Sequence, residues 1–188
     1  MLGFGLAAGE PPETEEAARW LSLARSGDAA AFEALLRIHE LQVARTALRL
    51  LGNRQDAQDA AQEVFLRLHR NLRQIDAAGN LAGWLYRVTV NVCRDMLRKR
   101  KNVAPLDDAR LGFESSTEAG LVRDQQLRMV REAMRALPEK ERAALTLRDL
   151  EGLSTGEVAG ILGSTEATVR SQVSAARLKI RKMLRSRL

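Results

Sequence analysis

The C-terminal segment carries cations that could neutralise phosphate groups. In STEATVRSQVSAARLKIRKMLRSRL, which ends the sequence, Glu166 is the last acidic residue and every later charge is positive. Of the 30 Lys and Arg and the 24 Asp and Glu residues, the stretch 1–121 contains 16 of each, so the whole excess of +6 lies after Leu121. A net charge concentrated on one terminal segment indicates a polyanionic partner. Nucleic acid and an anionic membrane surface are the two candidates.

The residues around the start of this segment have the pattern of a helix-turn-helix. Ser154 and Glu157 have the S-x-x-E spacing of a capping box, Gly163 can end the helix that follows, and Ser164 or Thr165 can cap a second helix. The second helix has an apolar stripe that steps by four, three and four residues: Val169, Val173, Ala176 and Ile180. A unit of this kind places its second helix in the major groove of DNA, which favours nucleic acid over a membrane.

The second helix of this unit divides its side chains between two tasks. Short polar residues near its start can reach base edges, whereas the cations beside and beyond them can contact phosphates. If about four cations neutralise phosphates, the logarithm of affinity falls with the logarithm of salt concentration at a slope of roughly −3.6. The predicted DNA contacts here are Ser164, Thr165, Glu166, Thr168, Arg170, Ser171, Ser174 and Arg177.

Two polar helix faces in the N-terminal half could bind partners. Asp56, Asp59 and Glu63 step by three and four residues and form an acidic face, which is either ordinary solvated surface or a docking site. The candidate protein contacts there are Asp56, Asp59, Gln62, Glu63, Phe65 and Leu66, of which the last two could instead be core. Further along, a polar and basic face that suits DNA repeats every three to four residues: Arg87, Asn91, Arg94 and Arg98.

Helices must position these side chains, because Leu, Ala, Arg and Glu dominate the sequence and aromatic residues make up only 4%. VTVNV at 88–92 could be a strand, but the helical stripe continues on both sides of it, so we expect helix there. The expected helices are Glu15–Arg25, one from the cap Asp28 to Gly52, about Asp56–Arg73, one capped by Asn80, Ser115–Leu137, Pro138–Gly152 and the helix-turn-helix pair.

The helical pattern fails between residues 102 and 120, where a proline, glycines, serines and acids mix without a period. We therefore predict an all-α fold of two small four-helix modules joined by a flexible linker, the C-terminal module containing the helix-turn-helix. The predicted segments are a flexible N-terminal tail at 1–16, a first module at 17–101, the linker at 102–120 and a second module at 121–188. About twenty linker residues reach at most about 70 Å, or about two turns of DNA.

Several other classes of protein are poorly supported. Cys93 is the only cysteine, so no intrachain disulfide can form, and with only His39 and His69 beside it a zinc site is unsupported. We expect Cys93 to be a buried packing residue. No run approaches the roughly 18 apolar residues of a membrane span, and the N-terminus lacks the basic start of a secretory signal. We expect a cytoplasmic protein without membrane span, catalytic residues, metal, cofactor or small-molecule substrate.

Two blocks of the sequence resemble conserved regions of one family. DAQDAAQEVFLRLHR followed by LAGWLYRVTVNVCRDMLRKRK resembles the second region of bacterial sigma factors, and ALPEKERAALTLRDLEGLSTGEVAGILGSTEATVRSQVSAAR resembles their fourth region. The lack of other regions is typical of the small extracytoplasmic-function (ECF) group. The resemblance implies that the chain binds core RNA polymerase, recognises both promoter elements and promotes DNA melting, usually under restraint by an anti-sigma factor.

The resemblance also assigns roles to the modules. It makes 17–101 sigma region 2, whose acidic face docks on the clamp helices of the largest polymerase subunit, and 121–188 sigma region 4, which binds the upstream element. The loop at about 76–80 and the helix after it would hold the downstream element and trap a flipped base, with Asn91 as a hydrogen-bonding group and Trp84 or Leu81 as a wall; Trp84 could also be core. The predicted downstream-element contacts are Asn80, Leu81, Trp84, Arg87, Asn91, Arg94, Arg98 and Lys99.

Two rival functions follow from the residues alone. A dimeric helix-turn-helix regulator would use the first module for dimerisation or signal reception, and it would bind duplex DNA tightly without polymerase. An enzyme with an appended DNA-binding unit would need a polar constellation in the first module, where the sequence offers only surface faces.

Overall fold

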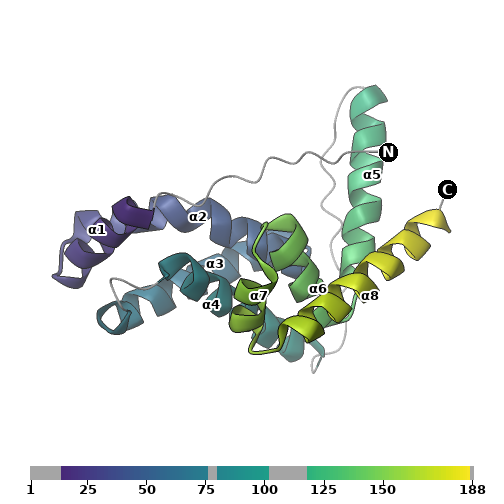
Figure 1. The fold of residues 1–188 in the computed structure, drawn as a ribbon. Coiled ribbons are helices and arrows are strands. Elements are labelled where there is room, and N and C mark those ends of the chain that lie inside the picture. Colours follow the sequence, from purple (N-terminus) through teal and green to yellow (C-terminus); the bar gives the residue numbers. More distant parts are fainter. Residues whose placement is uncertain (1–13, 76–79, 102–117, 187–188) are drawn as a thin grey trace.

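The computed structural model describes residues 14–75, 80–101 and 118–186, and every regular element in these ranges is helical. This confirms the predicted all-α class, and residues 88–92 lie within a helix (Figure 1). Most of the predicted tail and linker lies outside the described residues. The helices are α1 (Thr14–Arg25), α2 (Ala29–Leu51), α3 (Arg54–Asn71), α4 (Leu81–Lys101), α5 (Glu118–Arg135), α6 (Glu139–Leu145), α7 (Thr155–Leu162) and α8 (Glu166–Arg185), with a 3₁₀ turn η1 (Leu72–Gln74) and a π-helical turn η2 (Thr146–Leu150).

Side-chain caps begin several helices where the sequence predicted them. The Asp28 carboxylate accepts a hydrogen bond from the Ala31 N–H at 3.1 Å, and the Asn80 side chain accepts one from the Gly83 N–H at 2.8 Å. These bonds satisfy backbone donors that have no partner within the helix. At the other end of α2, Gly52 adopts the left-handed conformation with φ +80°. The predicted cap at Ser115 lies outside the described residues.

The predicted helix at 138–152 differs from the structure in two ways. Pro138 lies at the N-cap, one residue before α6 begins, rather than at the first helical position. After Leu145 the helix widens into η2, where the Glu151 N–H donates to the Thr146 carbonyl at 2.9 Å across five residues. Glu151 therefore leaves the helix at its end, beside α2 of the first module.

Helices α1 to α4 form the N-terminal module, in which α2 packs against α1, α3 and α4. The apolar faces predicted from the helical period meet in the centre of this module. His39 of α2 is buried there as well. The largest fully buried side chains of this module are Leu21, Leu35, Val43, Val64, Leu68 and Leu85.

Helices α5 to α8 form the C-terminal module, whose centre is the contact of α8 with α6 and α7. Three residues of the predicted stripe of α8, Val169, Val173 and Ala176, are buried in the same apolar cluster as Val158 of α7 and Leu147 of η2, and Ile180 is partly buried against that cluster. The two modules also pack on each other, since α7 contacts α4 and both α5 and η2 contact α2. The sequence did not predict this contact between the modules.

Candidate nucleic-acid interface

The helix-turn-helix has the local geometry that its sequence predicts. Ser154 accepts a hydrogen bond from the Glu157 N–H at 3.2 Å, and Glu157 accepts one from the Ser154 N–H at 2.7 Å, which completes the capping box of α7. Gly163 ends α7 with φ +61°. Thr165 caps α8 by accepting from the Thr168 N–H at 3.2 Å. The start of α8 is therefore held by α7 and by its own cap.

The predicted DNA-contacting side chains of this unit lie together on its outside. All of them are exposed except Ser164, which is half-buried. Arg170 forms an ion pair with Glu166 at 3.2 Å, one turn earlier on α8. The exposed members are Thr165, Glu166, Thr168, Arg170, Ser171, Ser174 and Arg177. The first half of α8 thus presents a polar face of hydroxyls, one carboxylate and one guanidinium, which are groups that can contact base edges in a major groove.

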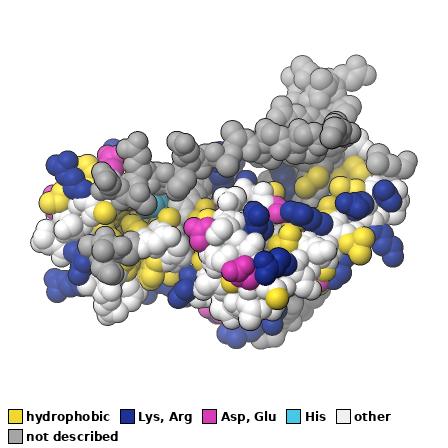
Figure 2. Space-filling model, viewed as in Figure 1, with side chains coloured by type: hydrophobic (Ala, Val, Ile, Leu, Met, Phe, Trp, Pro, Cys, Tyr) yellow, Lys and Arg dark blue, Asp and Glu magenta, His cyan; other side chains and the backbone are white. Residues whose placement is uncertain are grey.

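The cations in the second half of α8 divide into two groups, those paired with acidic residues of the same module and those exposed toward the end of the helix. Arg177 donates two hydrogen bonds to Asp149, at 2.7 and 2.8 Å, and Lys179 pairs with Glu141 at 2.6 Å. The hydrogen bonds to Asp149 are the main reason that the pKa of Arg177 is raised. Arg181, Lys182 and Arg185 are exposed further along α8. Figure 2 shows Lys and Arg side chains gathered along the end of the molecule that α8 forms.

The basic face predicted on α4 is only partly exposed. Arg87 donates to the Gly160 carbonyl of α7 at 2.9 Å, and Arg94 pairs with Glu139 of α6 at 2.7 Å. Asn91 and Lys99 are exposed, and Arg98 lies 3.6 Å from Asp95. The C-terminal module therefore occupies two of the three arginines of the predicted face.

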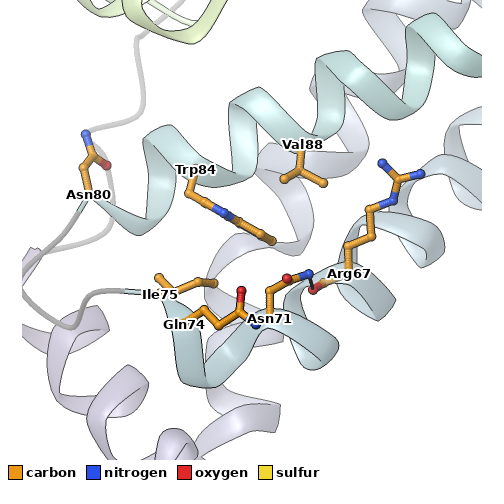
Figure 3. Close-up of a pocket in the computed structure, with 7 residues that line it drawn as sticks. All are labelled: Arg67, Asn71, Gln74, Ile75, Asn80, Trp84 and Val88. Carbon is orange, nitrogen blue, oxygen red and sulfur yellow. Dashed lines mark hydrogen bonds between the residues drawn. The ribbon is translucent and has the colours of Figure 1, made fainter.

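A pocket of about 440 Å³ opens beside this face, between the end of α3 and the start of α4. The Trp84 ring extends from α4 across the opening, opposite Asn71 and Gln74 (Figure 3). The Asn71 side chain is held by a hydrogen bond to the Arg67 carbonyl at 2.8 Å. Seven described residues line the pocket: Arg67, Asn71, Gln74, Ile75, Asn80, Trp84 and Val88. The pocket combines an indole wall with amide and guanidinium groups.

The pocket contains some predicted residues and lacks others. Asn80 and Trp84 line it as the sequence suggested, whereas Leu81 is 5% exposed and belongs to the core of the module. Residues 76–79 of the predicted loop lie outside the described residues. Sequence reasoning missed Arg67, Asn71 and Gln74 because they lie near the end of α3, and no local pattern shows that this end faces α4. The polar cluster RNLRQ at 70–74, directly after the buried stripe of α3, was the available signal.

The acidic face predicted on α3 splits in the structure. Asp59 and Gln62 are exposed, and Leu66 is 46% exposed beside them. Asp56 is instead buried, where it accepts a hydrogen bond from Asn53 and pairs with Arg100 of α4 at 2.6 Å. Asp56 therefore joins α3 to α4, and the exposed face consists of the later residues.

Two further predicted contacts of α3 have local partners. Glu63 accepts a hydrogen bond from Arg67 at 2.8 Å, which is the main reason that the pKa of Glu63 is lowered. Phe65 is half-buried and packs against the core.

None of the helices in the described ranges combines the length and the apolar composition that a membrane span requires.

Comparisons with known proteins match both halves of this arrangement. Residues 35–103 match the family described as Sigma-70 region 2, and residues 127–180 match Sigma-70, region 4. The chain is 36% identical over 167 residues to the ECF RNA polymerase sigma factor SigE of Mycolicibacterium smegmatis, a match that covers 85% of this chain and 65% of that protein. It is 32% identical over 161 residues to the ECF RNA polymerase sigma factor SigM of Mycobacterium tuberculosis, covering 85% of this chain and 80% of that one.

The fold also matches a solved structure. The sigma factor RpoE of Bartonella quintana, in complex with the anti-sigma factor NepR, superposes with a TM-score of 0.68 at 22% identity, covering 82% of this chain and 96% of that one. The two regions occur in the order that the sequence predicted. The chain therefore belongs to the extracytoplasmic-function group of bacterial sigma factors, non-enzymatic initiation factors that direct RNA polymerase to promoters.

Proposed function

We propose that this sigma factor holds two promoter elements on one duplex. In this proposal, α8 reads the upstream element, α4 and the pocket beside it hold the downstream element, and the pocket traps an unstacked base as the strands separate. The observation that carries the proposal is the pocket of about 440 Å³ at the edge of the basic face of α4. The working units are the predicted modules at 17–101 and 121–188.

The chemistry of the pocket suits a nucleobase. Extruding a base from the duplex costs a few kcal/mol, which a site that opens DNA must offset. Stacking on an aromatic side chain contributes about 1–3 kcal/mol per base, and Trp84 offers such a surface. The amides of Asn71 and Gln74 can each donate and accept hydrogen bonds, so they can discriminate between bases by their polar edges.

The exposed part of α3 is the proposed contact with core polymerase. Asp59, Gln62 and Glu63 present carboxylate and amide oxygens to solvent, and Leu66 adds an apolar contact. A rim of carboxylates steers a protein toward a basic partner surface and fixes the orientation in which it docks. Asp56 acts here as a positioning residue, because its partners Asn53 and Arg100 bury it.

A restraining protein partner is part of the proposal. The Bartonella quintana sigma factor that shares this fold is bound to an anti-sigma factor. We extend this to the present chain and place its work in the cytoplasm, where core polymerase is found. Co-purification from cells that yields only polymerase subunits under every stress condition would contradict the anti-sigma partner.

Run-off transcription with purified core polymerase on genomic fragments tests the proposed function. We expect initiation at discrete sites, and at limiting sigma factor the double variant Asp59→Asn, Glu63→Gln should lower it at least about tenfold through weaker docking. Glu33→Gln is the matched control, since Glu33 also pairs with an arginine one turn away on an exposed helix face. Full activity of the folded double variant would refute the docking site. Tight binding of a dimer to duplex DNA without polymerase would instead support the rival function, a dimeric helix-turn-helix regulator.

A further inference from the structure

Glu166 places a negative charge on the surface that is proposed to face DNA. It is the first residue of α8, and no acidic residue follows it in the chain. A carboxylate at the start of this helix repels phosphates, so it lowers the affinity of α8 for every duplex. A residue that lowers affinity in this way can still contribute to recognition if it favours one sequence over the others.

Contacts within the helix-turn-helix hold this carboxylate in place. One of its oxygens accepts a hydrogen bond from Arg170, one turn later on α8, at 3.2 Å. Its other oxygen lies against the first turn of α7, 3.6 Å from the position that a β-carbon on Gly156 would take. The side chains of Glu166 and Arg170 are nevertheless 53% and 65% exposed. The two groups are therefore oriented by each other and can still reach a ligand.

Other polar groups of the same surface already have partners. Thr165 accepts a hydrogen bond from the Thr168 N–H at 3.2 Å, and the two threonine hydroxyls lie 2.9 Å apart. Arg177 donates two hydrogen bonds to an aspartate of η2. Arg170 donates to Glu166 through one nitrogen, and a guanidinium carries five N–H donors. Glu166 and Arg170 are therefore the charged pair that the start of α8 can offer to base edges.

The donors and acceptors of this pair match one kind of base pair. In the major groove a G·C pair presents guanine N7 and O6, which accept hydrogen bonds, and then cytosine N4, which donates one. Arg170 offers parallel N–H donors for the two guanine acceptors, and Glu166 beside it offers an acceptor for the cytosine amino group. Beyond adenine N7, an A·T pair presents a donor and then an acceptor, so it would set donor against donor and acceptor against acceptor.

We propose that Glu166 and Arg170 act together to read one G·C base pair of the upstream element. This inference rests on the proposed function of α8. Because the ion pair already orients the guanidinium, less side-chain freedom is lost when DNA binds. Glu166 also opposes the use of Arg170 as a general phosphate contact, so the pair lowers the affinity for other sequences while it favours its own.

Selection by the full-length chain from a pool of duplexes with randomised base pairs tests this inference. We expect the original chain to favour G·C over A·T at one position at least about tenfold. Glu166→Gln should reduce this preference at least about threefold, because an amide can donate as well as accept. Its affinity for unselected duplex should rise at least about twofold at low salt, because one negative charge is lost. Glu33→Gln is the matched control, since Glu33 also pairs with an arginine one turn away on an exposed helix, and it should change neither quantity.

A shorter carboxylate separates base reading from support of the helix. Glu166→Asp keeps a negative charge at the start of α8, where it stabilises the helix, but draws the carboxylate back by one methylene. We expect this variant to lose the G·C preference as Glu166→Gln does, yet to keep the original free energy of unfolding and the original affinity for unselected duplex.

The remaining outcomes divide between the pair and the proposed function. If both Glu166 variants keep the original base preference while Arg170→Ala loses it, the paired reading is refuted. Enrichment of a base pair other than G·C at the position that Arg170→Ala relaxes would refute it as well. If the original chain enriches no base pair at all, the proposed reading of the upstream element by α8 is itself wrong.

Discussion

Helices α8 and α4 of this sigma factor carry similar polar and basic faces, but they differ in how much of that face is exposed. The first half of α8 leaves Thr168, Arg170 and Ser171 exposed. On α4, Arg87 and Arg94 already hold contacts with the other module. A helical spacing of cations thus identifies a candidate DNA-binding face but does not show whether that face is available. Changes on α8 should therefore show their effect in the free chain, whereas changes on α4 should show it only with polymerase.

The largest effect is expected at the pocket beside α4. Trp84→Ala removes the stacking surface, which at about 1–3 kcal/mol corresponds to about 5- to 150-fold less initiation from a duplex promoter. A template with the downstream element already unpaired should recover part of this loss, because opening no longer has to be offset. The measurement is run-off transcription with core polymerase on both templates.

Controls separate stacking from folding in this experiment. Trp84→Phe keeps an aromatic wall and should retain most activity, and Trp20→Ala on α1 makes the same substitution outside the pocket. Equal losses on duplex and unpaired templates would show that Trp84 has no part in strand opening.

A smaller effect is expected on α8. Arg170→Ala should weaken binding of the free chain to upstream-element duplex by roughly tenfold and relax the preference at one base position, since a good side-chain contact to a base contributes about 1–3 kcal/mol. Titrating a library of substituted sites measures both quantities. Arg37→Ala breaks a similar pair one turn apart on α2 and should leave binding intact. A uniform loss across all sites would assign Arg170 to phosphate contact instead.

The smallest effect is expected at the N-terminal cap of α7, the helix that packs against α8. Ser154→Ala should lower the free energy of unfolding by about 1 kcal/mol, measured by urea denaturation. Hydrogen bonds from Ser154 lower the pKa of Glu157. A lowered pKa stabilises the fold above the ordinary value of 4.5, and this stabilisation is lost as pH falls through the folded-state pKa.

The pH dependence of stability tests separately whether Glu157 contributes to the cap of α7. The difference in stability between the original chain and Glu157→Gln should be small, because Glu157 is exposed, and it should shrink once the pH is below 4.5. If the stability difference between the two chains grew as the pH fell, the capping hydrogen bonds of Glu157 would not be its cause.

Features that the sequence predicted correctly depend on contacts between near neighbours. The caps at Asp28, Asn80 and Ser154 each join residues three positions apart. The apolar stripes likewise follow from the period of a single helix. The positions of most helices, the helix-turn-helix and its exposed polar face could therefore be predicted with no knowledge of how the modules pack.

Features that the sequence did not predict depend on contacts across long stretches of chain. Glu151 meets Thr46 across 105 residues, and with 30 cations and 24 anions no local pattern selects that pairing. The polar lining of the pocket depends likewise on how α3 meets α4. Asp56 shares the helical spacing of Asp59, yet Arg100 buries it, so spacing alone gave the wrong exposure.

Gly52 shows how the docking of one module limits the choice of residue in the other. A left-handed φ of +80° could be filled by asparagine as well as glycine. A β-carbon at this position, however, would lie within 3 Å of the Arg135 side chain, whose guanidinium donates to the Gly52 carbonyl at 2.7 Å. Asparagine would therefore still terminate α2 but would displace Arg135. Among relatives, the residue that follows α2 should distinguish chains that can adopt the packed arrangement from those in which it merely ends a helix.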